Sequence, residues 1–205
     1  MYAIVDDKGN DVKEITYWTF YPYNRGKRVC IGAFIPGIGC AGAYSTFGNH
    51  VGDWERVRVY LVRGQPIFYY LWIHDSAITN KYGGAFAWNG REFSRKGIAL
   101  KTYNGHPIVY SADGSHGIWP NPGKHTYKNV GVDTLSDYTA DGGTYWNTWN
   151  NLKIVEYNKN RQYSGEFQFL EFKGRWGNKQ SGCNHPVKTF GGECILNDGP
   201  TGPPK

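Results

Sequence analysis

The chain has 205 residues and a formal net charge of +6, a length that suits one well-cored domain over 1–205 rather than two. Its longest apolar run, at 67–73, falls well short of the roughly 20 residues that cross a bilayer, which argues against a transmembrane protein. Lysine and arginine are scattered, so the charge favours an anionic surface as partner and indicates no specific nucleic-acid reader.

The composition favours β-structure. Aromatic residues make up 17% of the chain and glycine is abundant, whereas helix-forming runs of Leu, Ala, Glu and Lys are scarce. In chain order, we expect strands at 15–21, 54–62, 67–73, 85–88, 107–111, 152–156 and 166–173. The pattern predicts a mainly all-β fold, a two-layer β-sandwich with long loops and few short helices.

Two regions between the expected strands have the composition of loops. Residues 30–40 are rich in glycine, and residues 119–151 are rich in Pro, Gly, Asn and Asp, so we expect little regular structure in either. Asp133, Asp137 and Asp141 are spaced by four residues in the second region. Their spacing does not match a calcium-binding EF-hand loop, and we interpret them as solvated loop acids.

The four cysteines fall into two close pairs, each separated by a loop with glycine and proline. We expect the disulfides Cys30–Cys40 and Cys183–Cys194, each stabilising the fold by about 3 kcal/mol in the chain-entropy model. Paired cysteines favour an oxidising compartment and hence a secreted protein, with four unrelated thiols as the alternative. The opening MYAIVDDKGN has no signal peptide, so the protein lacks one or this is a mature form.

The stretch GNHVGDWE (48–55) places a histidine and two carboxylates at the start of an expected strand. Because strand side chains alternate, Asp53 and Glu55 face the same side as the aliphatic residues that follow, toward the core. Buried carboxylates need a positive partner. His50 completes a ligand set for a divalent metal ion, with Mg, Ca or Mn favoured over Zn. The alternatives are an arginine or a protonated histidine paired with the carboxylates.

Two further histidines follow apolar runs. His74 comes after YLWI and His116 lies in the loop after HPIVY, so both stand at the ends of expected strands, where functional loops converge. A neutral imidazole there can ligate a metal or act as a general base, which would make both residues catalytic in an enzyme. Taken singly, each is also a plausible structural histidine.

Several short stretches, in order along the chain, carry a resemblance to a known family. They are FYPYN (20–24), GNHVGDWE (48–55), HPIVY with GSH (106–110 and 114–116), GRWGN (174–178) and GPTGP (199–203). Together they resemble the vacuolar protein sorting-associated protein 62 family. That name comes from a sorting phenotype and implies no chemistry.

The pattern His50-x-x-Asp53-x-Glu55 is also distantly similar to the signature of the necrosis-inducing protein family. Those proteins are secreted cytolysins with a β-sandwich, in which a divalent cation held by such residues helps to bind lipid head groups. The resemblance implies metal ligation by His50, Asp53 and Glu55. An upstream aspartate of that signature has no counterpart here, so the site is either incomplete or completed by His74, His116 or Asp113.

Three functions follow from these observations. The favoured one is a secreted, toxin-like module that uses a divalent metal ion to bind an anionic membrane lipid head group or a cell-surface or cell-wall glycan. The alternative is a metal-dependent hydrolase or lyase with His116 or His74 as the base. The second alternative is an intracellular vacuolar trafficking factor, as the family name suggests.

Overall fold

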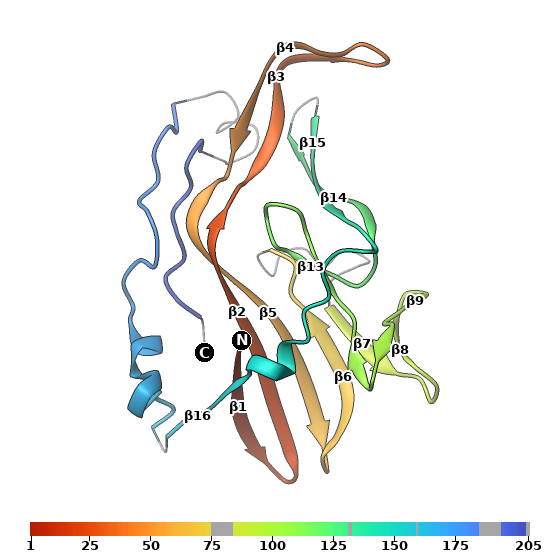
Figure 1. Cartoon of the computed structure of the whole chain (residues 1–205), viewed down its shortest axis with the longest axis vertical. Coiled ribbons are helices and arrows are strands. Elements are labelled where there is room, and N and C mark those ends of the chain that lie inside the picture. The colour runs from red at the N-terminus through yellow and green to blue at the C-terminus, as the bar shows by residue number, and fades with distance from the viewer. Residues whose placement is uncertain (75–83, 131–132, 159, 185–193, 204–205) are drawn as a thin grey trace.

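The computed structural model describes residues 1–74, 84–130, 133–158, 160–184 and 194–203 (Figure 1). Within this part of the chain one eight-stranded sheet has the order β16-β1-β2-β5-β6-β7-β8-β9. Its strands are β1 (Tyr2–Gly9), β2 (Val12–Asn24), β5 (His50–Val62), β6 (Gln65–Leu71), β7 (Gly84–Trp88), β8 (Phe93–Arg95), β9 (Ile98–Ala99) and β16 (Lys153–Glu156). Neighbours run antiparallel, except that β16 is parallel to β1.

Four two-stranded sheets accompany the large sheet in the described residues. They are β3 (Lys27–Ile35) with β4 (Gly39–Phe47), β10 (Thr102–Tyr103) with β11 (His106–Pro107), β12 (Tyr110–Ser111) with β13 (Ile118–Trp119), and β14 (Gly123–Val130) with β15 (Asp133–Thr139). The short 3-10 helices are η1 (Thr148–Asn151) and η2 (Gly165–Glu171), and no described helix is long and apolar enough to cross a membrane. The predicted mainly all-β fold is confirmed.

The hydrophobic core lies where the small sheets and loops cover the large one. Leu71, Phe86 and Phe93 of β6 to β8 pack with Leu100 and Ile118, the latter from β13. At the other end, a second cluster joins β1, β2 and β16 to η2, through Ile4, Trp18, Val155, Tyr163 and Leu170. Burying these side chains stabilises the layered arrangement by about 1.5–3 kcal/mol per large residue.

The structure corrects three of the predicted segments. Residues 30–40 belong to the β3–β4 hairpin, and the region 119–151 contains the β14–β15 hairpin. Glycine did not prevent pairing in the first, because its backbone ladder runs uninterrupted from Lys27–Phe47 to Ile35–Gly39. In the second, Leu135, Ser136 and Asp137 of β15 are all buried, and the loop-like composition of the region obscured this short buried run.

The predicted strand at 166–173 is the 3-10 helix η2 instead. With three residues per turn, Phe167 and Leu170 lie on one face and pack into the Ile4–Trp18 cluster. Phe169 and Phe172 contact Trp176. The apolar residues of this stretch therefore pack on two sides of a helix and not on the two faces of a strand.

Glycines in GRWGN and GPTGP fix the end of the chain against β5. A side chain at Gly177 would collide with the carbonyl oxygen of Val51, and a Cβ at Gly199 would lie 2.6 Å from the Cα of Gly177. The Trp176 amide donates to the Pro200 carbonyl at 2.7 Å. These close approaches place residues 197–202 along the beginning of β5.

Both predicted disulfides are confirmed. The Cα atoms are 5.5 Å apart in Cys30–Cys40 and 4.4 Å apart in Cys183–Cys194. The first links β3 to β4, and the second joins the segment after Trp176 to the segment that leads into residues 197–202. Each bridge therefore stabilises a part of the chain that lies outside the large sheet.

Candidate functional site

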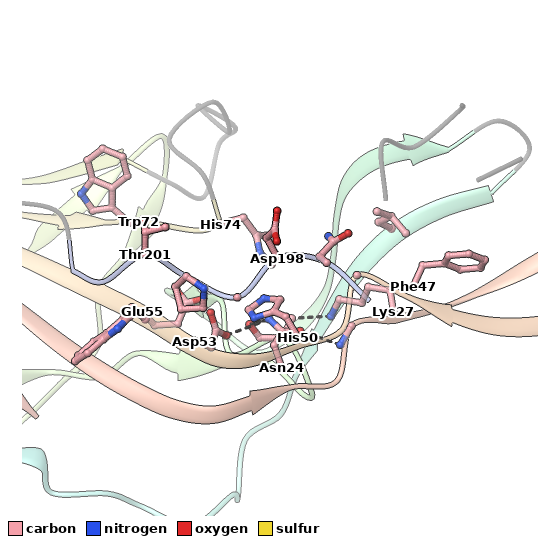
Figure 2. Close-up of a pocket in the computed structure, with 18 of the residues that line it drawn as sticks. Asn24, Lys27, Phe47, His50, Asp53, Glu55, Trp72, His74, Asp198 and Thr201 are labelled. Carbon is pink, nitrogen blue, oxygen red and sulfur yellow. Dashed lines mark hydrogen bonds between the residues drawn. The ribbon is translucent and has the colours of Figure 1, made fainter. Parts of the chain in front are cut away.

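A cleft of about 780 Å³ lies between the large sheet and the C-terminal segment 197–202. Figure 2 shows the segment, marked by Asp198 and Thr201, crossing the region of Asp53 and His50. Its polar lining comes from β2, β3, β5, the residues after β6 and the turn between β12 and β13, with Asn24, Lys27, His50, Asp53, Glu55, His74 and Ser115. The sequence-predicted residues His50, Asp53, Glu55 and His74 therefore line one cavity.

Asp53 and Glu55 point inward, as strand alternation predicted. Their exposed fractions are 8% and 7%. The Asn24 side-chain amide donates to Asp53 Oδ2 at 3.0 Å, and His116 Nδ1 lies 3.0 Å from the same oxygen. His116 in turn stacks on the Tyr21 ring, with centroids 4.0 Å apart. The compensation that a buried carboxylate requires is thus supplied to Asp53 by an imidazole and an amide, not by an arginine.

His50 is oriented by its own turn. Its Nδ1 donates to the Gly52 carbonyl oxygen at 2.6 Å. The turn needs a φ of +74° at Gly52, a conformation that glycine adopts readily.

Tyr21 lies beside the carboxylates. Burial raises the pKa of the Tyr21 hydroxyl, and the negative charges of Glu55 and Asp53 raise it further. Tyr21 therefore stays a neutral phenol beside the carboxylates.

His50, Asp53 and Glu55 were expected to bind a divalent metal ion. Within the described ranges, no three or more His, Cys, Asp or Glu side chains gather in a group that could hold one. Asp113 lies outside the cleft lining, where Arg25 binds its exposed carboxylate at 2.6 Å. Metal ligation by His50, Asp53, Glu55 and Asp113 stays a prediction.

A second network surrounds Asp137 of β15, whose side chain is fully buried. Lys27 Nζ lies 2.5 Å from its carboxylate, and His74 Nε2 lies 2.8 Å away. The Ser115 hydroxyl donates to it at 2.6 Å and the Trp119 indole N–H at 2.8 Å. Asp137 is therefore not a solvated loop acid, and the interpretation made from its spacing is wrong.

Opposing effects determine the pKa of Asp137. Burial alone would raise that pKa, but the hydrogen bond and charge of His74 and the charge of Lys27 outweigh burial and hold it well below its usual range. The signal that could have revealed this site is the spacing of Leu135 and Asp137, because residues two apart in a strand share one face, and Leu135 belongs to the core.

The two networks meet at neighbouring residues of one loop. The Asn24 side chain, bound to Asp53, also donates to the Ser115 carbonyl at 3.3 Å, and Ser115 adjoins His116. The Ser115 hydroxyl donates to Asp137 at 2.6 Å and accepts a hydrogen bond from Lys27 Nζ at 2.8 Å, so it is held inside this network. The arrangement holds polar groups in fixed positions, which suits recognition.

Aromatic side chains form another wall of the cleft, with Trp18, Trp54, Trp72 and Arg56. The Arg56 guanidinium lies 3.8 Å from the centroid of the Trp72 ring and 4.8 Å from that of Trp18. The indole N–H groups of Trp54 and Trp72 are buried and have no hydrogen-bond acceptor among the described residues. Both donors belong to side chains that line the cleft.

Two curated proteins of Saccharomyces cerevisiae are similar to the chain along nearly its whole length. Vacuolar protein sorting-associated protein 62 is 30% identical over 97% of the chain, and the putative vacuolar protein sorting-associated protein TDA6 is 29% identical over 98%. The chain belongs to the vacuolar protein sorting-associated protein 62 family. It spans 42% and 43% of the length of these two relatives, respectively. No protein-family model and no solved structure matches it.

Membership of the vacuolar protein sorting-associated protein 62 family corrects two predictions. The favoured function, a secreted metal-dependent toxin, is wrong, because the relatives that match nearly the whole chain are named for vacuolar protein sorting. The secreted location is wrong for the same reason. The favoured function depended on one short histidine–carboxylate pattern, whereas the similarity to the vacuolar sorting proteins extends along nearly the whole chain.

The stretches that resemble the vacuolar protein sorting-associated protein 62 family converge on the cleft. Its lining includes residues from 20–24, 48–55, 114–116 and 199–203. A further stretch, 174–178, binds the C-terminal segment through Trp176 and Pro200. Segments far apart in the sequence therefore build one site.

Proposed function

We propose that this chain serves vacuolar protein sorting as a binding module and that the cleft is its ligand site. The observation that carries the proposal is similarity to two vacuolar sorting proteins over at least 97% of the chain. The cleft supports a role in binding, because its charged groups are held by internal hydrogen bonds and ion pairs. Such preorganisation favours binding, since little ordering remains to oppose it.

A glycan is the ligand class that the cleft suits best. Lys27 is paired with Asp137, and Asp198 with Arg175 at 2.9 Å, so the lining has few uncompensated charges to attract an ion. Carboxylate and amide groups accept and donate to sugar hydroxyls, and tryptophan faces pack against sugar rings. Glu55 contributes an acceptor at the cleft wall. This binding requires no metal ion.

The two disulfides support a luminal location on the vacuolar route. Disulfides form and persist in oxidising compartments and are rare where glutathione keeps thiols reduced. All four cysteines are bridged. A luminal position reconciles this chemistry with the names of the relatives and places the cleft on the side where glycans are carried.

The sorting role is tested in cells from which the gene for this chain is deleted. We expect a vacuolar hydrolase to be missorted to the medium and its retention to be restored by the wild-type gene but not by a gene carrying Glu55→Gln. Unchanged sorting in the deletion strain would contradict the role. Full rescue by Glu55→Gln, at equal protein level, would contradict the use of the cleft.

Glycan binding is tested with the purified chain on an array of neutral oligosaccharides in the presence of a chelator. We expect Glu55→Gln to weaken binding about tenfold, the effect of losing one charge-assisted hydrogen bond. The matched control is Glu92→Gln, an exposed glutamate outside the cleft lining. Equal binding by both variants, or no binding by the wild type, would overturn the assignment of the ligand.

A further inference from the structure

The β3–β4 hairpin extends from the body of the molecule and bends near its end (Figure 1). Its base is anchored, because Val29 and Phe47 pack with Leu135 of β15. Its tip is the turn Ile35-Pro36-Gly37-Ile38, in which the Ile38 amide donates to the Ile35 carbonyl at 3.0 Å. Proline at the second position and glycine with φ of +80° at the third are what a type II turn requires.

The bend occurs at a pair of glycines and is held by a disulfide. Cys40 pairs with Phe34, four residues beyond Cys30, and an extended strand would separate those positions by about 13 Å. The Cα atoms of Cys30 and Cys40 are nevertheless 5.5 Å apart. Gly32 and Gly42 face each other midway, with φ of +144° and +150°. The tip is therefore presented at a fixed angle to the base.

The distal part of the hairpin is apolar and exposed. The sequence GAFIPGIGCAGAY (32–44) contains no charged side chain, and its one side-chain hydroxyl is that of Tyr44. The exposed fractions of Ile38, Ile35 and Tyr44 are 81%, 39% and 44%. Large aliphatic side chains at the tip of a projecting element make an exposed apolar patch of the kind that marks an interaction site.

We propose that this hairpin tip docks into the surface of an anionic lipid bilayer. The backbone groups that face the partner strand are paired in the hairpin's own ladder, and those on its two outer edges stay hydrated when the hairpin lies at the level of the lipid head groups and only its side chains go deeper. Arg28 lies behind the tip with its guanidinium 4.1 Å from the centre of the Tyr44 ring. Tyrosine and arginine are suited to the head-group region, with the isoleucines reaching the acyl chains.

A bilayer fits this surface better than a protein partner does. Protein interfaces carry about one hydrogen bond per 100–200 Å², whereas the side chains of 32–43 offer none. The net charge of +6 complements anionic lipid and opposes a second copy of the same chain. The inference depends on the hairpin alone and stands whether or not the cleft binds a glycan.

The test is flotation of the purified, oxidised chain with vesicles of phosphatidylcholine and phosphatidylserine at a ratio of about 7 to 3. We expect binding that weakens about tenfold or more in Ile38→Asp, because a charge at the apolar boundary is costly. The matched control is Ile154→Asp, since Ile154 is 62% exposed on β16, far along the sequence from the hairpin. Binding by this variant should equal that of the wild type.

A second variant tests the geometry of the tip. Replacing both Cys30 and Cys40 by serine removes the brace on the bend but keeps every isoleucine, and we expect weaker binding with an unchanged lipid preference. The proposal is overturned if the wild type does not float with the vesicles, or if Ile38→Asp floats as well as Ile154→Asp. It is also overturned if sedimentation shows a dimer that Ile38→Asp abolishes without any lipid binding.

Discussion

At the scale of single residues, the charge of Asp137 is the most consequential in the fold. Its carboxylate is fully buried. It forms ion pairs with Lys27 and His74 and accepts hydrogen bonds from Ser115 and Trp119. A carboxylate held by so many donors is stable inside a protein, but removing its charge leaves a buried ammonium group without compensation. The residue therefore joins β3, β15 and the loops at the cleft.

We expect Asp137→Asn to lower the free energy of unfolding by about 3 kcal/mol at pH 7, the usual cost of breaking a buried ion pair. Urea denaturation measures the change. The control is Asp113→Asn, whose exposed pair with Arg25 should contribute about 0–1 kcal/mol. Equal effects of the two substitutions would contradict the assigned role of Asp137.

The same carboxylate predicts a pH dependence. The folded-state pKa of Asp137 lies below its unfolded value of about 3.9, so its stabilising contribution is complete above that pH and declines as pH falls toward the folded pKa. The difference in unfolding free energy between wild type and Asp137→Asn should therefore shrink as the pH falls below about 4. Urea denaturation at a series of pH values measures it, and a difference that grows on acidification would contradict the direction of the shift.

Sequence reasoning at this scale succeeded where it depended on local geometry. Alternation along a strand correctly placed Asp53 and Glu55 toward the interior. It could not identify His116 as the partner of Asp53, because the two residues are 63 positions apart and meet through the fold. Asp137 was missed for a related reason, since its strand has the composition of a loop.

At the scale of elements, the C-terminal segment is held to β5 by contacts that exclude a side chain. A Cβ at Gly177 would collide with the Val51 carbonyl oxygen and would meet Gly199 as well. We expect Gly177→Ala to lower the free energy of unfolding by about 1–3 kcal/mol and to weaken the packing of Trp176. The added methyl group would collide with backbone atoms, which cannot move away as a flexible side chain could. Thermal unfolding followed by tryptophan fluorescence measures both effects.

The control for this substitution is Gly143→Ala, where a Cβ would have no neighbour within 4 Å. It should leave stability nearly unchanged. If both substitutions are neutral, the C-terminal segment does not depend on close backbone approach and the cleft is less rigid than its geometry implies.

Strands of the large sheet were predictable because their apolar runs are long and have a clear period. The β3–β4 hairpin was not, since its glycines belong to a bend that composition cannot distinguish from a loop. The helix η2 was not predicted either. Phe167 and Leu170 are three residues apart and face the core, but the neighbouring Phe169 packs on Trp176 and hides this period in the sequence.

At the scale of the whole molecule, a strand from the second half of the sequence completes the sheet at the N-terminal strands. Strand β16 pairs with β1 in parallel, and the core beneath β1 and β2 is closed by Val155, Tyr163 and Leu170. Contacts between residues so distant in sequence form late and make folding cooperative. The N-terminal strands therefore depend on residues supplied more than a hundred positions later.

This dependence predicts a large effect of Leu170→Ala. Leu170 is 2% exposed, and we expect its truncation to lower the free energy of unfolding by about 2–5 kcal/mol. The cost is large because the helix cannot shift to fill the cavity that the substitution leaves beneath the strands. The half-buried Leu61 provides the control, with an expected cost of about 1 kcal/mol for Leu61→Ala. Far-UV circular dichroism, which reports the sheet, and tryptophan fluorescence should lose signal in one shared transition. Two separate transitions would show instead that the sheet holds together without the segment carrying Leu170, and the N-terminal strands would then owe their stability to β5 and β6.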